Sequence, residues 1–229
     1  MKAFQKFTKK ELLIFCVEAL FAGVLIGFGG TVSLLAASFI GGGWGRFIGG
    51  VLFALAMFMI ISFRLKLLTG MLCDVPTMGV KNYWQLAVCL LFNTLGVLAV
   101  SLLVRYSFIG ETAVDVGAKL IGAKLNAKNW AGGVLCSGVL CGVMINVSVW
   151  SPKFTAARGL SCTLGVILPI VLFAFCGFDH CVANMLYLAF LGECSWQIIG
   201  YVFLSVLGNL LGGVLLPLIL LLRGEKKDA

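Results

Sequence analysis

The chain has 229 residues, of which 61% are hydrophobic and only 11% are charged, and its mean hydropathy is +1.10. A soluble globular domain carries about 25% charged residues, so this composition excludes that class and indicates an integral membrane protein. The formal net charge of +8 does not indicate a nucleic-acid-binding protein, because the basic residues lie at the chain ends and in connections between apolar segments.

Six apolar segments approach the ~20 residues that a helix needs to cross a bilayer. The first follows a basic N-terminal stretch that superficially resembles a signal peptide, but it contains Glu18 and extends beyond the apolar core of such a peptide. We therefore predict six membrane helices, at about Leu12–Gly30, Phe47–Phe63, Trp84–Val104, Trp130–Trp150, Gly159–Phe190 and Ile198–Leu222.

Two of these segments are interrupted. The second ends in the polar stretch Arg64–Gly70, and the fifth is too long for one crossing and contains Gly177–His180 near its middle. Backbone groups exposed by a break at membrane depth are tolerated only if they are buried in protein or line a wet cavity. We therefore predict that the two breaks form the walls of one path.

The two halves of the chain follow the same plan. In each half a broken middle helix is followed by a helix with the pattern Asn-x-x-Gly, at Asn93–Gly96 and Asn209–Gly212. Because each half has three spans, the repeats must be inverted, as in many transport proteins. The predicted fold is an all-α membrane protein of six transmembrane helices in two inverted three-helix repeats, with the second and fifth helices broken.

An even number of spans places both termini on one face of the membrane, and the positive-inside rule identifies that face as cytoplasmic. We expect a single transmembrane channel domain over 1–229, with cytoplasmic ends at 1–11 and 223–229 around a six-helix pore domain at 12–222. The terminal face carries most of the basic residues, namely Lys2, Lys6, Lys9, Lys10, Lys81, Lys153, Arg158, Arg223, Lys226 and Lys227.

The only histidine, His180, lies next to Asp179 in the second break. An ionisable pair at this depth costs free energy and marks a functional candidate, although a histidine can also simply tie two helices together. Imidazole has an unperturbed pKa of ~6.5, and a cationic or proton-donating ring would offset the cost of desolvating a small anion. Thr69 in the first break supplies a second hydrogen-bonding group, and Asp179 either orients His180 or bonds the exposed backbone.

The segment Gly177–Met185 reads Gly-Phe-Asp-His-Cys-Val-Ala-Asn-Met and resembles the Gly-Phe-Glu-His-x-x-Ala-Asn-Met segment of the formate/nitrite transporters. Leu67-Leu68-Thr69 is similar to the Leu-Phe-Thr loop of that family, Gly138–Trp150 to its fourth-helix ending, and Gly208–Gly213 to its Gly-Asn-x-x-Gly-Gly. The resemblance covers nearly all of the chain. It implies a homopentamer of aquaporin-like protomers, each with its own pore, in a bacterial-type cytoplasmic membrane.

The same resemblance implies roles for individual residues. Thr69, His180, Asn209 and Leu67 would form the pore centre, with Asn209 helping to hold His180 and Asp179 supporting it. A vestibule lysine of the family is similar to Lys124, with Lys128 as the alternative, and would concentrate anions at the mouth. The implied apolar constrictions are Phe53, Met57, Leu68, Ile145 and Phe173.

Three positions depart from the family pattern. Gly142 replaces an asparagine of the fourth helix, which alters the hydrogen-bond support of the central histidine. Lys66 occupies a usually acidic position, and Ser137 replaces a common arginine. These departures bear on the substrate more than on the fold.

The preferred function is passage of a small monovalent anion, such as formate, nitrite, hydrosulfide or a short carboxylate, and proton exchange at His180 or nearby water is expected to let the solute cross partly as its neutral acid. The alternative is an aquaporin-like neutral-solute pore, but the chain contains no Asn-Pro-Ala turn. An intramembrane enzyme using Cys181 is disfavoured because no nucleophile or zinc-protease motif is present.

The nine cysteines are scattered without a CxxC pair, so we expect no metal or cofactor. The expected partners are the anion, protons and the lipid bilayer.

Overall fold

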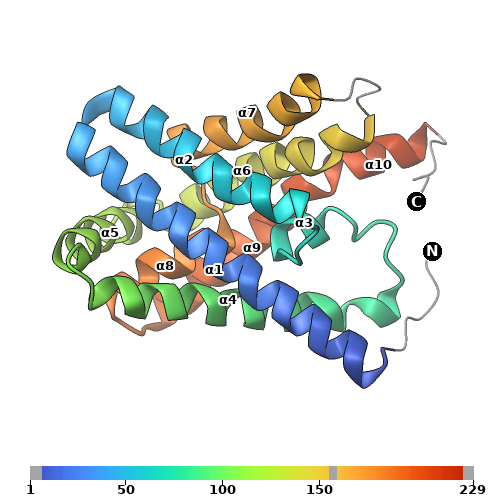
Figure 1. Cartoon of the computed structure of the whole chain (residues 1–229), viewed down its shortest axis with the longest axis horizontal. Helices are drawn as coiled ribbons and strands as arrows, with labels where there is room; N and C mark the ends of the chain where they lie inside the picture. The colour runs from blue at the N-terminus through green and yellow to red at the C-terminus, as the bar shows by residue number, and fades with distance from the viewer. Residues whose placement is uncertain (1–6, 155–158, 224–229) are drawn as a thin grey trace.

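The computed structural model describes residues 7–154 and 159–223, and in this part of the chain all regular structure is helical. It contains six helical units long and apolar enough to cross a membrane, which confirms the predicted number. Lys2, Lys6, Arg158, Lys226 and Lys227, used for the predicted orientation, lie outside the described residues. The helices are α1 (Lys9–Ile40), α2 (Gly42–Ser62), α3 (Leu68–Leu72), the short 3-10 helix Val80–Asn82, α4 (Trp84–Arg105), α5 (Gly110–Leu125), α6 (Trp130–Phe154), α7 (Leu160–Cys176), α8 (Cys181–Leu191), α9 (Trp196–Gly213) and α10 (Leu215–Leu222) (Figure 1).

Helix α1 is longer than the predicted first span, because it continues beyond Gly30 to Ile40. It begins with a capping box in which the Thr8 hydroxyl accepts from the Glu11 backbone N–H at 3.2 Å and the Glu11 carboxylate accepts from the Thr8 N–H at 2.8 Å. It ends at Gly41, whose φ of 73° lies in the left-handed region that stops a helix. The start of α1 and the end of α10 lie at the same end of the bundle (Figure 1).

Helix α5 was not predicted, since its sequence was interpreted as a connection between the third and fourth spans. It has 16 residues, too few for a span, and packs against α8 at the end of the bundle opposite the start of α1 (Figure 1). Its buried side is formed by Ala113, Gly117, Ile121 and Leu125, which recur every four residues.

The two breaks have the same backbone geometry in both halves. Helices α2 and α7 each end in a turn through the left-handed region, at Arg64 with φ 55° and at Gly177 with φ 74°. The next N–H, of Leu65 or Phe178, then bonds a carbonyl in the last turn of the preceding helix, at 2.9 and 3.0 Å. The predicted pair of inverted repeats with broken second and fifth spans is therefore confirmed.

The helix pairs α1 with α4 and α6 with α9 cross with their backbones in contact. A Cβ atom added at Gly23 would overlap the carbonyl oxygen of Asn93, and one added at Gly142 would overlap the carbonyl oxygen of Asn209. Small residues at such crossings allow membrane helices to pack closely. Packing therefore explains the glycine at position 142, because any longer side chain there would force α6 and α9 apart.

Gly142→Ala is expected to destabilise the protein by about 1–3 kcal/mol, because the added methyl meets backbone atoms that cannot rotate away. The matched control is Gly133→Ala in the same helix, where an added Cβ meets nothing within 4 Å. The control is expected to change stability by no more than about 0.5 kcal/mol. Thermal unfolding of both purified variants in detergent measures the difference, and equal melting temperatures would contradict the close crossing.

Candidate functional site

Asn93 on α4 holds the first break in place. Its Oδ1 accepts from the Leu68 N–H at 2.8 Å, and its Nδ2 donates to the carbonyl oxygens of Lys66 at 2.9 Å and Ala19 at 2.7 Å. The side chain is fully buried. One amide therefore satisfies backbone groups that the break would otherwise leave unpaired, which is the condition for a broken helix inside a membrane.

Asn209 on α9 holds the second break in the same way. Its Oδ1 accepts from the Cys181 N–H at 2.9 Å, and its Nδ2 donates to the carbonyl oxygens of Asp179 at 2.7 Å and Gly138 at 2.9 Å. Asn209 thus fixes the main chain on both sides of His180 rather than contacting the imidazole ring. The two Asn-x-x-Gly helices serve equivalent purposes in the two halves.

His180 lies at the N-terminus of α8 and is 1% exposed. Its Nδ1 accepts from the backbone N–H of Ala183 at 3.0 Å, so the side chain caps the helix. Its Nε2 lies 3.1 Å from the hydroxyl oxygen of Thr69. A neutral ring whose Nδ1 accepts a hydrogen bond carries its proton on Nε2, so this N–H is directed at Thr69. The structure therefore brings together the two polar residues expected at the pore centre.

Two of the expected constriction residues pack against His180. The ring centroids of Phe53 and Phe173 lie 5.7 Å apart at an interplanar angle of 84°. Phe173 stacks on the imidazole at 5.9 Å, and Phe53 meets its edge at 6.2 Å. Phe53 and Phe173 therefore cover one side of the imidazole with apolar rings.

The remaining predicted centre and constriction residues are also buried. Leu67 is the N-cap residue of α3, the position that His180 occupies in α8, and is 4% exposed. Leu68, Met57 and Ile145 are at most 2% exposed and belong to the same apolar cluster as Leu67. These residues give the interior around Thr69 a low polarity, which strengthens hydrogen bonds to any charge that enters.

Asp179 does not orient the imidazole through its carboxylate. Its Oδ1 accepts from Lys124 Nζ at 2.7 Å, from Asn184 Nδ2 at 2.9 Å and from the Tyr201 hydroxyl. Its backbone N–H donates to the Ser137 hydroxyl at 2.9 Å. The support that Asp179 gives to His180 therefore passes through the main chain, which this network holds.

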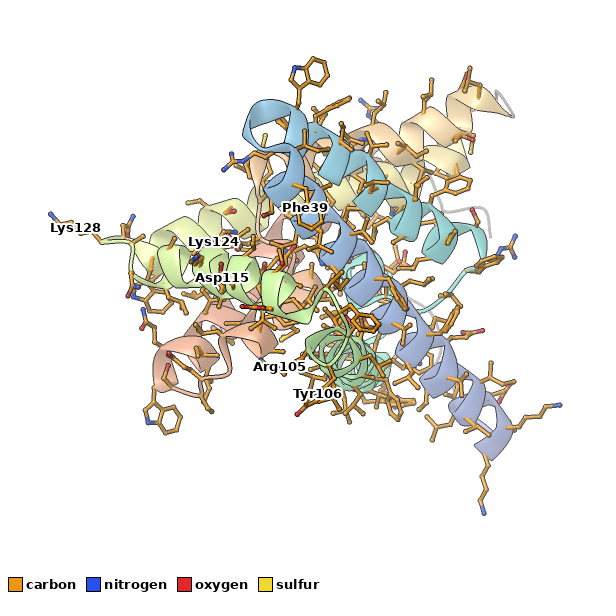
Figure 2. The ribbon with its side chains drawn as sticks, turned by 60° about the vertical axis from the view of Figure 1, so that its left-hand side comes forward. Phe39, Arg105, Tyr106, Asp115, Lys124 and Lys128 are labelled. Atoms are coloured by element: carbon orange, nitrogen blue, oxygen red, sulfur yellow. The ribbon has the colours of Figure 1, made fainter. Side chains whose placement is uncertain are left out.

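A cavity of about 600 Å³ leads from the surface beside α5 to His180. Arg46, Lys119 and Lys124 line it, and the phenyl rings of Phe53 and Phe173 border it next to the histidine. Lys124 also donates to the Gly177 carbonyl at 3.0 Å, so it reaches the break itself. Lys128 points away from the bundle in Figure 2, so the cavity lysines are Lys119 and Lys124.

Sequence reasoning did not assign a function to Tyr201 or Asn184, which hold Asp179. Tyr201 lies roughly two turns before Asn209 on the same helix, so both side chains share a face and the spacing was a usable signal. Asn184 lies inside the matched motif. Within residues 7–154 and 159–223, no group of three or more His, Cys, Asp or Glu residues is placed to hold a metal ion.

Known proteins resemble this chain in sequence and in fold. The family model described as Formate/nitrite transporter matches residues 1–222. The uncharacterized transporter YrhG of Bacillus subtilis is 28% identical over 207 residues, which is 81% of this chain and 75% of YrhG. The formate channel FocB of Escherichia coli is 25% identical over 198 residues, which is 82% of this chain and 70% of FocB.

Solved structures share the architecture. An FNT family ion channel matches with a TM-score of 0.79 at 22% identity, covering 94% of this chain and 91% of that one. A pentameric formate channel with formate bound matches with a TM-score of 0.76 at 20% identity, covering 96% of this chain and all of that one at 100%. These two likenesses establish the same fold.

Proposed function

The chain belongs to the formate/nitrite transporter family, and from this premise we propose that it passes small monovalent anions across a membrane through a pore within each protomer. The observation that carries the proposal is the contact between Thr69 and His180, made where two broken helices meet. The formate channel named among its relatives supports formate as a solute, and the family as a whole supports nitrite; hydrosulfide is proposed as a third small monovalent anion of similar size.

The cavity beside α5 is the proposed entrance. Three cations, Arg46, Lys119 and Lys124, line one concave surface, and such a surface raises the local concentration of anions. Two ion pairs offset part of this charge, since Lys124 Nζ lies 2.7 Å from Asp179 Oδ1 and Lys119 Nζ lies 2.7 Å from Asp115 Oδ2. The net potential of the cavity walls is therefore positive but moderate, which favours entry without trapping the anion.

The centre is proposed to replace water around the anion. Removing a small anion from water costs several kcal/mol, and directed donors offset that cost. His180 Nε2–H and the Thr69 hydroxyl are such donors, and the N-terminus of α8 adds the positive end of a helix dipole. Phe53 and Phe173 exclude water from this site and allow only solutes that shed their hydration shell.

Proton exchange is proposed to accompany the anion. A solute that crosses partly as its neutral acid loses less hydration energy. Because Nδ1 of His180 is bound to the Ala183 N–H, only Nε2 faces the path, and we expect the proton to arrive with the anion from water in the entrance cavity.

The proposed assembly is a homopentamer in a cytoplasmic membrane, with both termini on the cytoplasmic face and residues 12–222 forming the pore domain. The pentameric formate channel of the same fold supports the assembly. The exposed apolar side chains along α1, α4 and α9 give each protomer surface for neighbouring subunits and for lipid.

Flux through proteoliposomes tests this function. We expect formate and nitrite to enter faster than lactate, by about tenfold or more, because the Phe53–Phe173 slit discriminates by size. The anion panel should include hydrosulfide and acetate, and uptake should rise as the external pH falls if a proton accompanies the anion. Protein-free liposomes are the control. Rapid water permeation without anion uptake would instead support a neutral-solute pore.

A further inference from the structure

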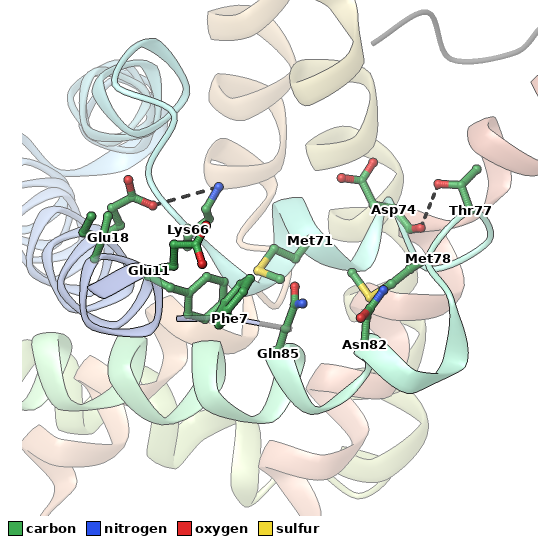
Figure 3. A pocket seen from close by; sticks show the side chains of 12 residues that line it. Phe7, Glu11, Glu18, Lys66, Met71, Asp74, Thr77, Met78, Asn82 and Gln85 are labelled. Carbon is green, nitrogen blue, oxygen red and sulfur yellow. Dashed lines mark hydrogen bonds and ion pairs between the residues drawn. The ribbon is translucent and has the colours of Figure 1, made fainter. Parts of the chain in front are cut away.

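A second cavity, of about 330 Å³, lies at the end of the bundle where α1 begins (Figure 3). It is bordered by the first turns of α1, by α3 and the loop after it, and by the start of α4. It is separate from the entrance cavity, which lies beside α5, and the two share no lining residue. Its walls are Phe7, Glu11, Ile14, Phe15, Glu18, Lys66, Met71, Asp74, Thr77, Met78, Asn82 and Gln85.

Gln85 places an unpaired hydrogen-bond donor in the wall of this cavity. The side chain is 7% exposed, and its Nε2 has no hydrogen-bond partner among the described residues. In Figure 3 it points toward the space between Met71 and Asn82. A buried donor left unpaired costs about 1–3 kcal/mol, so its presence in a cavity wall indicates a ligand with an acceptor oxygen.

The inverted repeat supports this interpretation. Gln85 precedes Asn93 by the same spacing as Tyr201 precedes Asn209. In the second half, the Tyr201 hydroxyl donates to the Asp179 carboxylate, so the residue that corresponds to Gln85 is paired. In the first half, the residue that matches Asp179 next to the break is Lys66, whose side chain is itself a donor, so this position offers Gln85 no acceptor.

The charges of the cavity select the ligand further. Three carboxylates, Glu11, Glu18 and Asp74, and one ammonium group, that of Lys66, line the cavity. Lys66 Nζ and Glu18 Oε2 lie 3.9 Å apart, beyond hydrogen-bond distance, so both keep bonding capacity. The carboxylates disfavour a simple anion, and the two donors disfavour a simple cation. A zwitterion satisfies both groups of residues, because its ammonium binds the carboxylates and its anionic oxygens accept from the two donors.

The depth of the cavity indicates where such a zwitterion comes from. Glu11 and Glu18 lie in the first three turns of α1, about 10 Å apart along its axis, so the cavity wall extends from the start of the helix toward the apolar interior. Ile14, between them, is 47% exposed and apolar. We propose that this cavity binds the phosphoethanolamine headgroup of a membrane lipid, with its ammonium at Glu18 and its phosphate oxygens at Gln85 Nε2 and Lys66 Nζ.

Lipid retention measured by native mass spectrometry tests the proposal. The protein is extracted from vesicles of equal parts phosphatidylethanolamine and phosphatidylglycerol, and we expect it to retain phosphatidylethanolamine preferentially. Gln85→Leu and Glu18→Gln should each weaken that retention about tenfold, the effect of one lost hydrogen bond to a charged group. Glu111→Gln, on the exposed start of α5, is the matched control and should retain the lipid as the wild type does.

Soluble O-phosphoethanolamine distinguishes the headgroup from the whole lipid. At millimolar concentration it should compete with the retained lipid in the wild type and in Glu111→Gln. Equal retention of the two lipids by the wild type, or unchanged retention in both cavity variants, would overturn the proposal. These readouts are independent of transport, so they do not depend on which solute crosses the membrane.

Discussion

Substitution of His180 by alanine is expected to lower formate flux about ten- to a hundredfold in proteoliposomes. The imidazole Nε2 is the donor directed at Thr69, 3.1 Å away, in a centre that is otherwise apolar. A hydrogen bond to a charged group contributes about 1.5–3 kcal/mol, which corresponds to this range of rates when it is lost from the centre of the path. Formate uptake at a fixed pH gradient, normalised to reconstituted protein, measures the change.

The alanine variant also removes the cap of α8, since Nδ1 accepts from the Ala183 N–H. His180→Asn separates the two effects. An asparagine at this position retains the cap, because its side-chain oxygen reaches the same N–H, but it is too short to reach Thr69. We expect His180→Asn to melt like the wild type and to transport like His180→Ala. Wild-type flux in the asparagine variant would refute the central role of the imidazole.

The breaks were predictable from sequence because backbone polarity constrains membrane helices so strongly. Glycine, threonine, aspartate and histidine at membrane depth identified both breaks, and the paired Asn-x-x-Gly patterns indicated the inverted halves. Thr69 and His180 were likewise found from their position. Their contact follows from the inversion, which brings the starts of α3 and α8 to the middle of the bundle.

The parts that sequence reasoning missed depend on packing between distant residues. Helix α5 is amphipathic and shorter than a membrane span, so a search for long apolar segments passes over it. The partners of Asp179 come from three helices, with Lys124 on α5, Asn184 on α8 and Tyr201 on α9. No local sequence pattern predicts which of these donors binds the carboxylate. Because α5 was not predicted, the position of Lys124 next to the second break could not be predicted either.

The role of Gly142 is set by helix packing, which the sequence alone does not show. At the sequence level it removed an amide from the surroundings of His180. In the structure it lies against the Asn209 carbonyl, as Gly23 lies against that of Asn93. The main-chain support of the histidine comes from Asn209, and the close crossing that Gly142 allows positions that asparagine.

Asn209→Leu is expected to destabilise the protein by about 3–6 kcal/mol, which is enough to prevent recovery of folded protein from detergent extracts. Leucine fills a similar volume but leaves the Cys181 N–H and the carbonyls of Asp179 and Gly138 without the amide. Each buried polar group left unpaired costs about 1–3 kcal/mol, and no water replaces the amide in a packed membrane interior. Size-exclusion chromatography of the extracts and thermal unfolding measure the loss.

Because the two halves are inverted repeats, Asn93→Leu is expected to lower the free energy of unfolding by the same amount as Asn209→Leu. Asn93 also makes three backbone hydrogen bonds, across the first break, and is equally buried. Asn126→Leu, at the exposed end of α5, is the control and should cost little. A large loss from one of the buried asparagines and none from the other would mean that the two breaks are held differently, against the matched hydrogen bonds of the structure.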